Sequence, residues 1–135
     1  MKEVRFKDWC MPEFDERGMT KWGWICVHRE KFKLGHETDI GFGTYINAQF
    51  GVEIGDKVQI GAGCRIYSIS TIDGRYGKVV IKEGACIGAN SVVLPGVVIG
   101  RNSIVGALSL VNRDIPPNEI WVGAPIRKLK DRVIE

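Results

Sequence analysis

Aliphatic residues recur at every sixth position through most of the chain. In sixes, the sequence reads LGHETD, IGFGTY and INAQFG from Leu34, IGDKVQ, IGAGCR and IYSIST from Ile54, and IKEGAC, IGANSV, VLPGVV, IGRNSI, VGALSL and VNRDIP from Ile81. A six-residue period matches neither the 3.6-residue period of an α-helix nor a heptad. The pattern therefore predicts short strands separated by tight corners, stacked into a parallel β-helix around an aliphatic column.

Two further positions of the repeat are regular. The fifth position is mostly small, so we expect it to point inward with the aliphatic first position. The second position is often glycine, which suits a bend where the backbone needs permissive dihedral angles. Every third phrase lacks this glycine, and the phrases therefore group into about four coils: 34–53, 54–80, 81–98 and 99 to about 116.

The segments outside the repeat predict a cap and a tail. Residues 1–33 contain three tryptophans but no six-residue pattern, which favours an N-terminal cap over the open end of the solenoid. The β-helix is expected over 34–116. Residues 117–135 are expected to form a loop and a short C-terminal helix after Pro125.

Departures from the period all fall in the third phrase of a coil. Two extra residues precede Ile54, and nine extra residues lie between Ile66 and Ile81. In a stacked solenoid such insertions project from one side, which commonly marks a binding face. The alternative is a side that only tolerates loops.

Composition narrows the functional classes. A chain of 135 residues with 44% hydrophobic content suits one domain. The apolar runs are too short to span a membrane and the charged N-terminus does not resemble a signal peptide, so a cytoplasmic protein is expected. Four cysteines without a CxxC pair predict buried free thiols and no metal site. A scattered net charge of +3 does not indicate nucleic acid.

The final phrases, VVIKEGACIGANSVVLPGVVIGRNSIVGALSLVNRDIPPNEIWVGAPIRKLK, resemble the hexapeptide-repeat acyltransferases. This family includes galactoside, maltose and xenobiotic acetyltransferases and enzymes of surface-polysaccharide biosynthesis. The resemblance covers about residues 34 to 130. It implies a left-handed β-helix, a homotrimer with active sites between neighbouring subunits, and acetyl-CoA as the acyl donor.

The resemblance also implies contacts to the donor. Small side chains leave room for its pantetheine arm, and cations meet its phosphates. The positions carried over are Ala89, Ala107, Asn112, Arg113, Arg127 and Lys130. For the last cations, an ordinary solvated tail is the alternative.

Members of the family that acylate hydroxyls carry a catalytic histidine in the interrupted phrase, whereas IYSISTIDGRYGK contains none. A sugar hydroxyl needs a base to remove its proton. An amine with a pKa of about 8 is partly neutral near pH 7 and needs less assistance. We therefore expect acylation of the amino group of a sugar or nucleotide-linked sugar.

Two residues are candidates to replace the missing base. Asp73 begins the loop and could accept a proton or hold a cationic amine, although Asp-Gly pairs are often only turns. His36 lies on a different corner from the loop, but across a trimer interface it could face a neighbour's loop. His28 precedes the regular phrases and is expected to have a packing or surface role.

Acceptor contacts are expected in the loop and in the segments beside it. Amides can both donate and accept hydrogen bonds, as hydroxyl-rich ligands require. Ser70 fits the inward fifth position and is assigned to the core. The candidates are Asn47, Gln49, Tyr67, Ser68, Arg75 and Tyr76. A flexible hairpin without a ligand is the alternative for the loop.

Other functions remain open at this point. One is a sugar O-acetyltransferase that uses His36 or Asp73. Another is a non-catalytic trimeric scaffold. A metal-dependent hydratase on this fold is disfavoured, because it needs three histidines and the chain has two.

Overall fold

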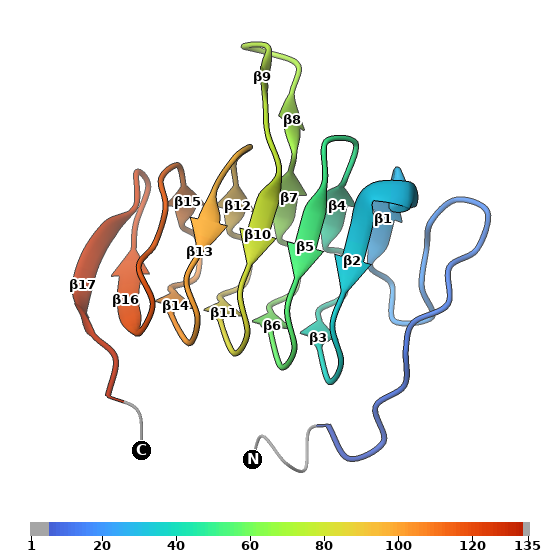
Figure 1. The fold of residues 1–135 in the computed structure, drawn as a ribbon, viewed down its shortest axis with the longest axis horizontal. Coiled ribbons are helices and arrows are strands. Elements are labelled where there is room, and N and C mark those ends of the chain that lie inside the picture. Colours follow the sequence, from blue (N-terminus) through green and yellow to red (C-terminus); the bar gives the residue numbers. More distant parts are fainter. Residues whose placement is uncertain (1–5, 134–135) are drawn as a thin grey trace.

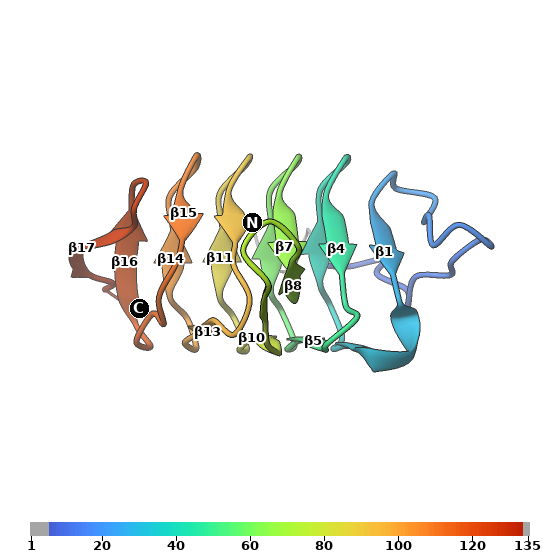
Figure 2. The same ribbon diagram turned by 90° about the horizontal axis from the view of Figure 1, so that it is seen from above.

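The computed structural model describes residues 6–133, which form a left-handed parallel β-helix. Short strands stack into three sheets, and each coil except the last contributes one strand to each sheet (Figure 1; Figure 2). Sheet A contains β1 (Ile25–Val27), β4 (Tyr45–Asn47), β7 (Arg65–Tyr67), β12 (Val92–Val93) and β15 (Leu110–Val111). Sheet B contains β2 (Phe32–Leu34), β5 (Val52–Ile54), β10 (Val79–Ile81) and β13 (Val98–Ile99).

Sheet C completes the prism. It contains β3 (Asp39–Ile40), β6 (Gln59–Ile60), β11 (Cys86–Ile87), β14 (Ile104–Val105), β16 (Glu119–Val122) and β17 (Arg127–Asp131). All of these strands pair in parallel except β17, which runs antiparallel to β16. A separate two-stranded ribbon, β8 (Ile69–Ser70) and β9 (Arg75–Tyr76), projects from the stack.

The first position of the repeat builds the core, as the sequence predicts. In sheet A, Ile66 is in register with Ile46 on one side and Val93 on the other, and all three are fully buried. Each sheet has such a column, and the three columns meet along the axis. Burial of a side chain of this size stabilises the fold by about 1.5–3 kcal/mol.

The second-position glycines are needed for a different reason from the expected one. Their φ angles are not in the left-handed region; the φ angle is positive at the fourth position instead, for example at Asn90 and Gly96. A Cβ atom at Gly88 would lie 2.4 Å from the backbone nitrogen of Ala107 in the next coil. The glycines therefore allow the coils to stack closely at their corners.

Side chains at the fifth position point inward, and several of them bond to the next coil. At the corner between sheets C and A, the donors lie in one column: Thr44 to the Gly61 carbonyl at 3.0 Å, Cys64 to the Gly88 carbonyl at 3.2 Å and Ser91 to the Gly106 carbonyl at 3.2 Å. This ladder satisfies buried polar groups that would otherwise be costly.

The stack begins earlier than the sequence analysis expects. Strands β1 and β2 lie before or across the boundary at residue 34 and already occupy sheets A and B. A 3-10 turn, η1 (Arg29–Lys31), separates them and hides the six-residue period. Trp24, which is 2% exposed, packs edge-to-face on Phe14 and Phe32 at this end of the core.

The expected C-terminal helix is wrong. Residues 127–131 form β17, and Lys128 on this strand bonds to Glu119 of β16 at 3.4 Å. The last strand of an open stack presents unpaired backbone groups, so a following strand gains hydrogen bonds there that a detached helix would not. Within residues 6–133, no helix is long and apolar enough to cross a membrane.

Two of the four cysteines are buried, as the sequence predicts, and two are not. Cys26 and Cys64 are buried, and burial raises the pKa of Cys26 to about 12, which makes it a poor nucleophile. Cys86 is half-buried. Cys10 is exposed, because the segment that carries it lies outside the stack.

Candidate functional site

Three columns of corners run along the stack, and they separate the candidate residues. The A–B corners follow the strands of sheet A, the B–C corners follow those of sheet B, and the C–A corners follow those of sheet C. In a parallel solenoid, residues in one column lie beside one another even when they are far apart in sequence.

The loop predicted from the nine extra residues forms an arm at an A–B corner. Strands β8 and β9 of this arm lie between β7 and β10 and extend away from the prism (Figure 1). The tip contains Ile72, which is 98% exposed, and Gly74 with φ of 70°. Beyond the arm, Val79 pairs directly with Val52, so the insertion does not disturb the stack.

Ser68, expected to contact the acceptor, is instead part of the support of the arm. It is fully buried; its hydroxyl donates to the Asn47 carbonyl at 2.7 Å and accepts from the Phe50 amide at 3.0 Å. Ser70, expected in the core, lies on the half-exposed strand β8. Ser68 still follows the stack, like Ala48 one coil earlier, and the chain turns out into the arm before Ser70 can reach the inward fifth position.

Aromatic and amide side chains surround the foot of the arm. Tyr67 is in register with Asn47, and its ring lies 5.9 Å from that of Tyr45 on the same face of sheet A. The exposed ring of Tyr76 on β9 lies 4.8 Å from the ring of Phe50 at the preceding A–B corner. The structure thus brings the predicted residues Asn47, Tyr67 and Tyr76 to one edge.

The predicted contacts Gln49 and Arg75 lie at the same edge. The backbone N–H of Gln49 donates to the side-chain oxygen of Asn47 at 3.1 Å, and the Gln49 residue is exposed at the corner. Arg75 forms an exposed ion pair with Asp73 at 3.9 Å. Phe50 is a further residue at this edge that the sequence analysis did not identify. It could have been identified as an aromatic residue close to the two extra residues that precede Ile54.

Asp73 is held as a carboxylate. Hydrogen bonds from the Arg75 backbone amide, at 3.2 Å, and from the Ser70 hydroxyl lower the pKa of Asp73. A lowered pKa makes Asp73 a weaker base than an ordinary carboxylate at neutral pH. Its geometry suits a group that accepts a hydrogen bond from a ligand.

The histidines lie on different corners. His36 is at a B–C corner, where its side chain is 74% exposed, Nδ1 lies 3.8 Å from Asp56 and the ring packs edge-to-face on Trp9 at 5.8 Å. His28 is at the first A–B corner, in the same column as the arm. This placement follows from the early start of the stack. Within one chain, His36 is therefore not beside Asp73.

The predicted donor contacts fall into three pairs. Ala89 and Ala107 are neighbours in the C–A column, where Gly88 and Gly106 allow close backbone approach. A groove of about 370 Å³, lined by Gly88 and Ala107 among others, runs along sheet C. Small side chains there leave the backbone open to an extended ligand.

The other two pairs lie elsewhere. Asn112 and Arg113 are in the A–B column, with the Arg113 guanidinium 5.6 Å from the centre of the Trp121 ring. Arg127 and Lys130 are on β17 at the C-terminal end, both exposed. Their neighbour Lys128 is paired with Glu119 and Asp131, whereas neither Arg127 nor Lys130 has an ion pair within residues 6–133. One chain therefore does not gather all six residues.

Two family models match the chain. The model described as "Bacterial transferase hexapeptide (six repeats)" matches residues 78–113, and "Hexapeptide repeat of succinyl-transferase" matches residues 33–68. A galactoside O-acetyltransferase from Lactococcus lactis is 37% identical over 113 residues, which cover 69% of this chain and 55% of that protein.

The name of a second relative describes transfer of an acetyl group to nitrogen. The dTDP-3-amino-3,6-dideoxy-alpha-D-galactopyranose 3-N-acetyltransferase of Aneurinibacillus thermoaerophilus is 48% identical over 52 residues, covering 38% of this chain and 27% of that protein. The chain thus spans about half or less of these curated relatives. Among solved structures, a hexapeptide-repeat acetyltransferase from Vibrio cholerae in complex with acetyl coenzyme A aligns with a TM-score of 0.77 and 30% identity, covering 82% of this chain and 66% of that chain.

Proposed function

The chain belongs to the hexapeptide-repeat acyltransferase family, and on this premise we propose that it transfers an acetyl group from acetyl-CoA to a sugar or nucleotide-linked sugar. We propose further that the preferred acceptor group is an amine. The similar Vibrio cholerae protein was solved with acetyl-CoA, and relatives named for transfer to oxygen and to nitrogen both match. The chemistry of the arm supports the choice of nitrogen.

The observation that carries this choice is the composition of the arm. Strands β8 and β9 and the turn between them contain no histidine, and the carboxylate present, Asp73, has a lowered pKa. A hydroxyl acceptor needs a base that takes its proton during attack. An amine carries its own lone pair once it is neutral.

The reaction then needs little from the protein beyond positioning. The amine nitrogen attacks the thioester carbonyl carbon, the carbon–sulfur bond breaks, and the departing thiolate takes up the proton that the nitrogen loses. Asp73 would accept a hydrogen bond from the amine and orient it, while Tyr76 and Phe50 would hold the sugar or base against the foot of the arm.

A trimer would complete the site. Within one chain, the candidate acceptor residues lie in the A–B column and Ala89 and Ala107 lie in the C–A column. Packing three prisms side by side brings unlike corners together, so each cleft would combine the arm of one subunit with the small-residue corner of the next. We place this assembly in the cytoplasm, the compartment expected from the sequence.

The decisive experiment compares matched acceptors. Acetyl-CoA is mixed with amino sugars and with the corresponding hydroxyl-only sugars, free and nucleotide-linked; free thiol is followed, and the product is identified by mass spectrometry. We expect transfer to the amino sugars. Comparable rates on hydroxyl-only sugars would refute the amine preference.

Variants separate the remaining candidates. His36→Ala and His28→Ala should retain activity, and Asp73→Asn should raise KM more than it lowers kcat. Near-complete loss in His36→Ala would instead support an O-acetyltransferase that uses this base. Calorimetry with coenzyme A tests the scaffold alternative, which predicts no binding. A solution mass three times that of the 15.0 kDa chain is expected.

A further inference from the structure

An exposed aromatic residue ends the column of small residues at the C–A corners. The C–A corners of four successive coils carry equivalent residues, joined by backbone hydrogen bonds of 2.9 Å from each corner to the next: Phe42, Ala62, Ala89 and Ala107. Phe42 is the one large side chain among these four and is 75% exposed. The column therefore changes from small to large toward its N-terminal end.

The Phe42 ring is directed away from the alanines. It rests on Gly23, at the corner before β1, where a Cβ atom would collide with the ring. Ala62, one corner further along the column, is itself exposed. The groove along sheet C, which is lined by residues from Asp39 to Ala107, runs beside these corners. A ligand along this column thus has room over Ala62 and meets the Phe42 ring at the next corner.

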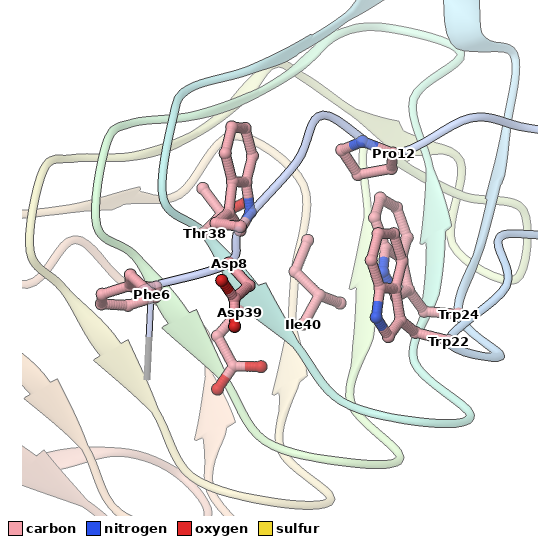
Figure 3. A pocket seen from close by; sticks show the side chains of 9 residues that line it. Phe6, Asp8, Pro12, Trp22, Trp24, Thr38, Asp39 and Ile40 are labelled. Atoms are coloured by element: carbon pink, nitrogen blue, oxygen red, sulfur yellow. The ribbon is translucent and has the colours of Figure 1, made fainter. Parts of the chain in front are cut away.

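The N-terminal segment packs behind Phe42. Trp22, the residue before Gly23, lines a pocket of about 220 Å³ together with Trp24 and Ile40. Figure 3 shows the rings of Trp22 and Trp24 on one side of Ile40. The corner at Gly23 is therefore tied to the end of the core, and it supports the Phe42 ring from the side opposite to the alanines.

The height of the arm along the stack sets the height of the reacting thioester. The arm leaves the stack between β7 and β10, in the same coil as Ala62. A threefold axis parallel to the prisms keeps every coil at its own height, so in the proposed trimer the arm of one subunit would face Ala62 of the next. The predicted donor contacts Ala89 and Ala107 lie in the following two coils. The acyl group, at the opposite end of the donor from its phosphates, would then point toward Phe42.

We propose that Phe42 limits the length of the acyl group, so that the site takes acetyl and excludes butyryl and longer chains. This inference rests on the acetyl transfer proposed above and names the donors that it admits. Successive corners are about 4.8 Å apart, the spacing of neighbouring strands, so an acetyl group over Ala62 ends before the Phe42 ring and a longer chain runs into it. A surplus methylene in a closed apolar site changes selectivity by about 10- to 200-fold.

Calorimetry with acyl-CoA thioesters of increasing length tests the limit without requiring turnover. The parent protein should bind butyryl-CoA and hexanoyl-CoA at least about tenfold more weakly than acetyl-CoA. Phe42→Ala should bring the affinity for butyryl-CoA to within about threefold of that for acetyl-CoA, because the obstructing ring is gone. A purely structural role for Phe42 predicts a lower Tm in this variant and an unchanged ratio between the two affinities.

Two further variants locate the effect. Leu108→Ala is the matched control, because Leu108 is 71% exposed beside Ala107 at the other end of the column. This variant should leave the ratio between butyryl-CoA and acetyl-CoA unchanged. Ala62→Leu fills the space assigned to the acyl group and should weaken acetyl-CoA about tenfold relative to coenzyme A.

The outcomes separate this inference from the proposed function. Equal affinity of the parent protein for acetyl-CoA and butyryl-CoA, or the same ratio in Phe42→Ala as in the parent, would overturn the length limit and leave acetyl transfer standing. Discrimination by length without transfer to any amino sugar would refute the proposed function alone. Absence of coenzyme A binding would overturn both.

Discussion

Replacement of Ser68 by alanine separates a structural role from substrate contact. The serine hydroxyl donates to the Asn47 carbonyl and accepts from the Phe50 amide. The carbonyl keeps a partner in Ser68→Ala, because the Ser68 backbone amide also donates to it at 3.0 Å. The Phe50 amide loses its partner, and an unsatisfied donor in this part-buried position costs about 1–3 kcal/mol.

This cost converts to a measurable change in thermal stability. A chain of this length has an unfolding entropy for which 1 kcal/mol corresponds to about 3.5 °C, so Ser68→Ala should lower Tm by roughly 4–10 °C. Far-ultraviolet circular dichroism and calorimetry at fixed protein concentration measure it. Ser70→Ala is the matched control, because Ser70 lies on the half-exposed arm, and its Tm should change by less than about 3 °C.

Unchanged stability of Ser68→Ala would contradict a structural role for this hydroxyl. If Ser68 were an acceptor contact, as the sequence suggested, Ser68→Ala would leave Tm unchanged and raise KM for the acceptor alone. A Tm equal to that of the parent protein, with the Phe50 amide still protected from hydrogen exchange, would show that the hydroxyl is not needed at the foot of the arm.

Four other outcomes are expected. The kcat/KM value for amine acetylation should rise tenfold per pH unit up to about pH 8, where the acceptor becomes neutral; an inflection near 6.5 in a pH–rate profile would indicate a histidine base instead. Cys64→Ser should change the unfolding free energy in urea by less than about 1 kcal/mol, because a hydroxyl can donate to the Gly88 carbonyl as the thiol does; a larger loss would contradict this. Gly88→Ala should lower the unfolding free energy by about 1–3 kcal/mol, because the added methyl group overpacks the corner. Gly96→Asn, at an open site with positive φ, should lower it by less than about 1 kcal/mol. Equal losses in the two variants would contradict the need for glycine where the coils stack. Hydrogen bonding by Lys78 lowers the pKa of Glu53, so the stability from this contact is present above pH 4.5 and is lost as the pH falls through the lowered pKa. Glu53→Gln should flatten this part of the curve of stability against pH. The change should be under about 1 kcal/mol, because the pair is largely exposed.

The repeat made the stack predictable from sequence. An aliphatic residue at the first position and a small residue at the fifth have one inward arrangement that buries both, and the structure has it. The C-terminal strand was not predictable in the same way, because β17 depends on the free edge of β16 rather than on local propensity. The same holds for β1 and β2, whose period is hidden by a turn.

The candidate site was predictable at the level of the corner, and less so at the level of the residue. Counting extra residues located the arm, but not the point at which the chain leaves the repeat. Ser68 and Ser70 are two residues apart and would share a face in a continuous strand, so their different environments depend on where the chain turns out of the stack. Phe50 was missed for a related reason: its partner, Tyr76, approaches it only through the arm.

The same geometry separates the parts of the chain on which the stack depends from a part on which it does not. Strand β10 resumes its pairing with β5 immediately beyond the arm, so the energy of the stack does not depend on the residues from Ile69 to Tyr76. The small C–A corners, by contrast, are fixed by the close approach of successive coils. On the function proposed above, a donor bound along these corners would depend on the repeat itself, whereas the acceptor chemistry would depend on a segment that lies outside the stack. On the proposed function, the absence of histidine from the arm therefore bears on the acceptor rather than on the fold.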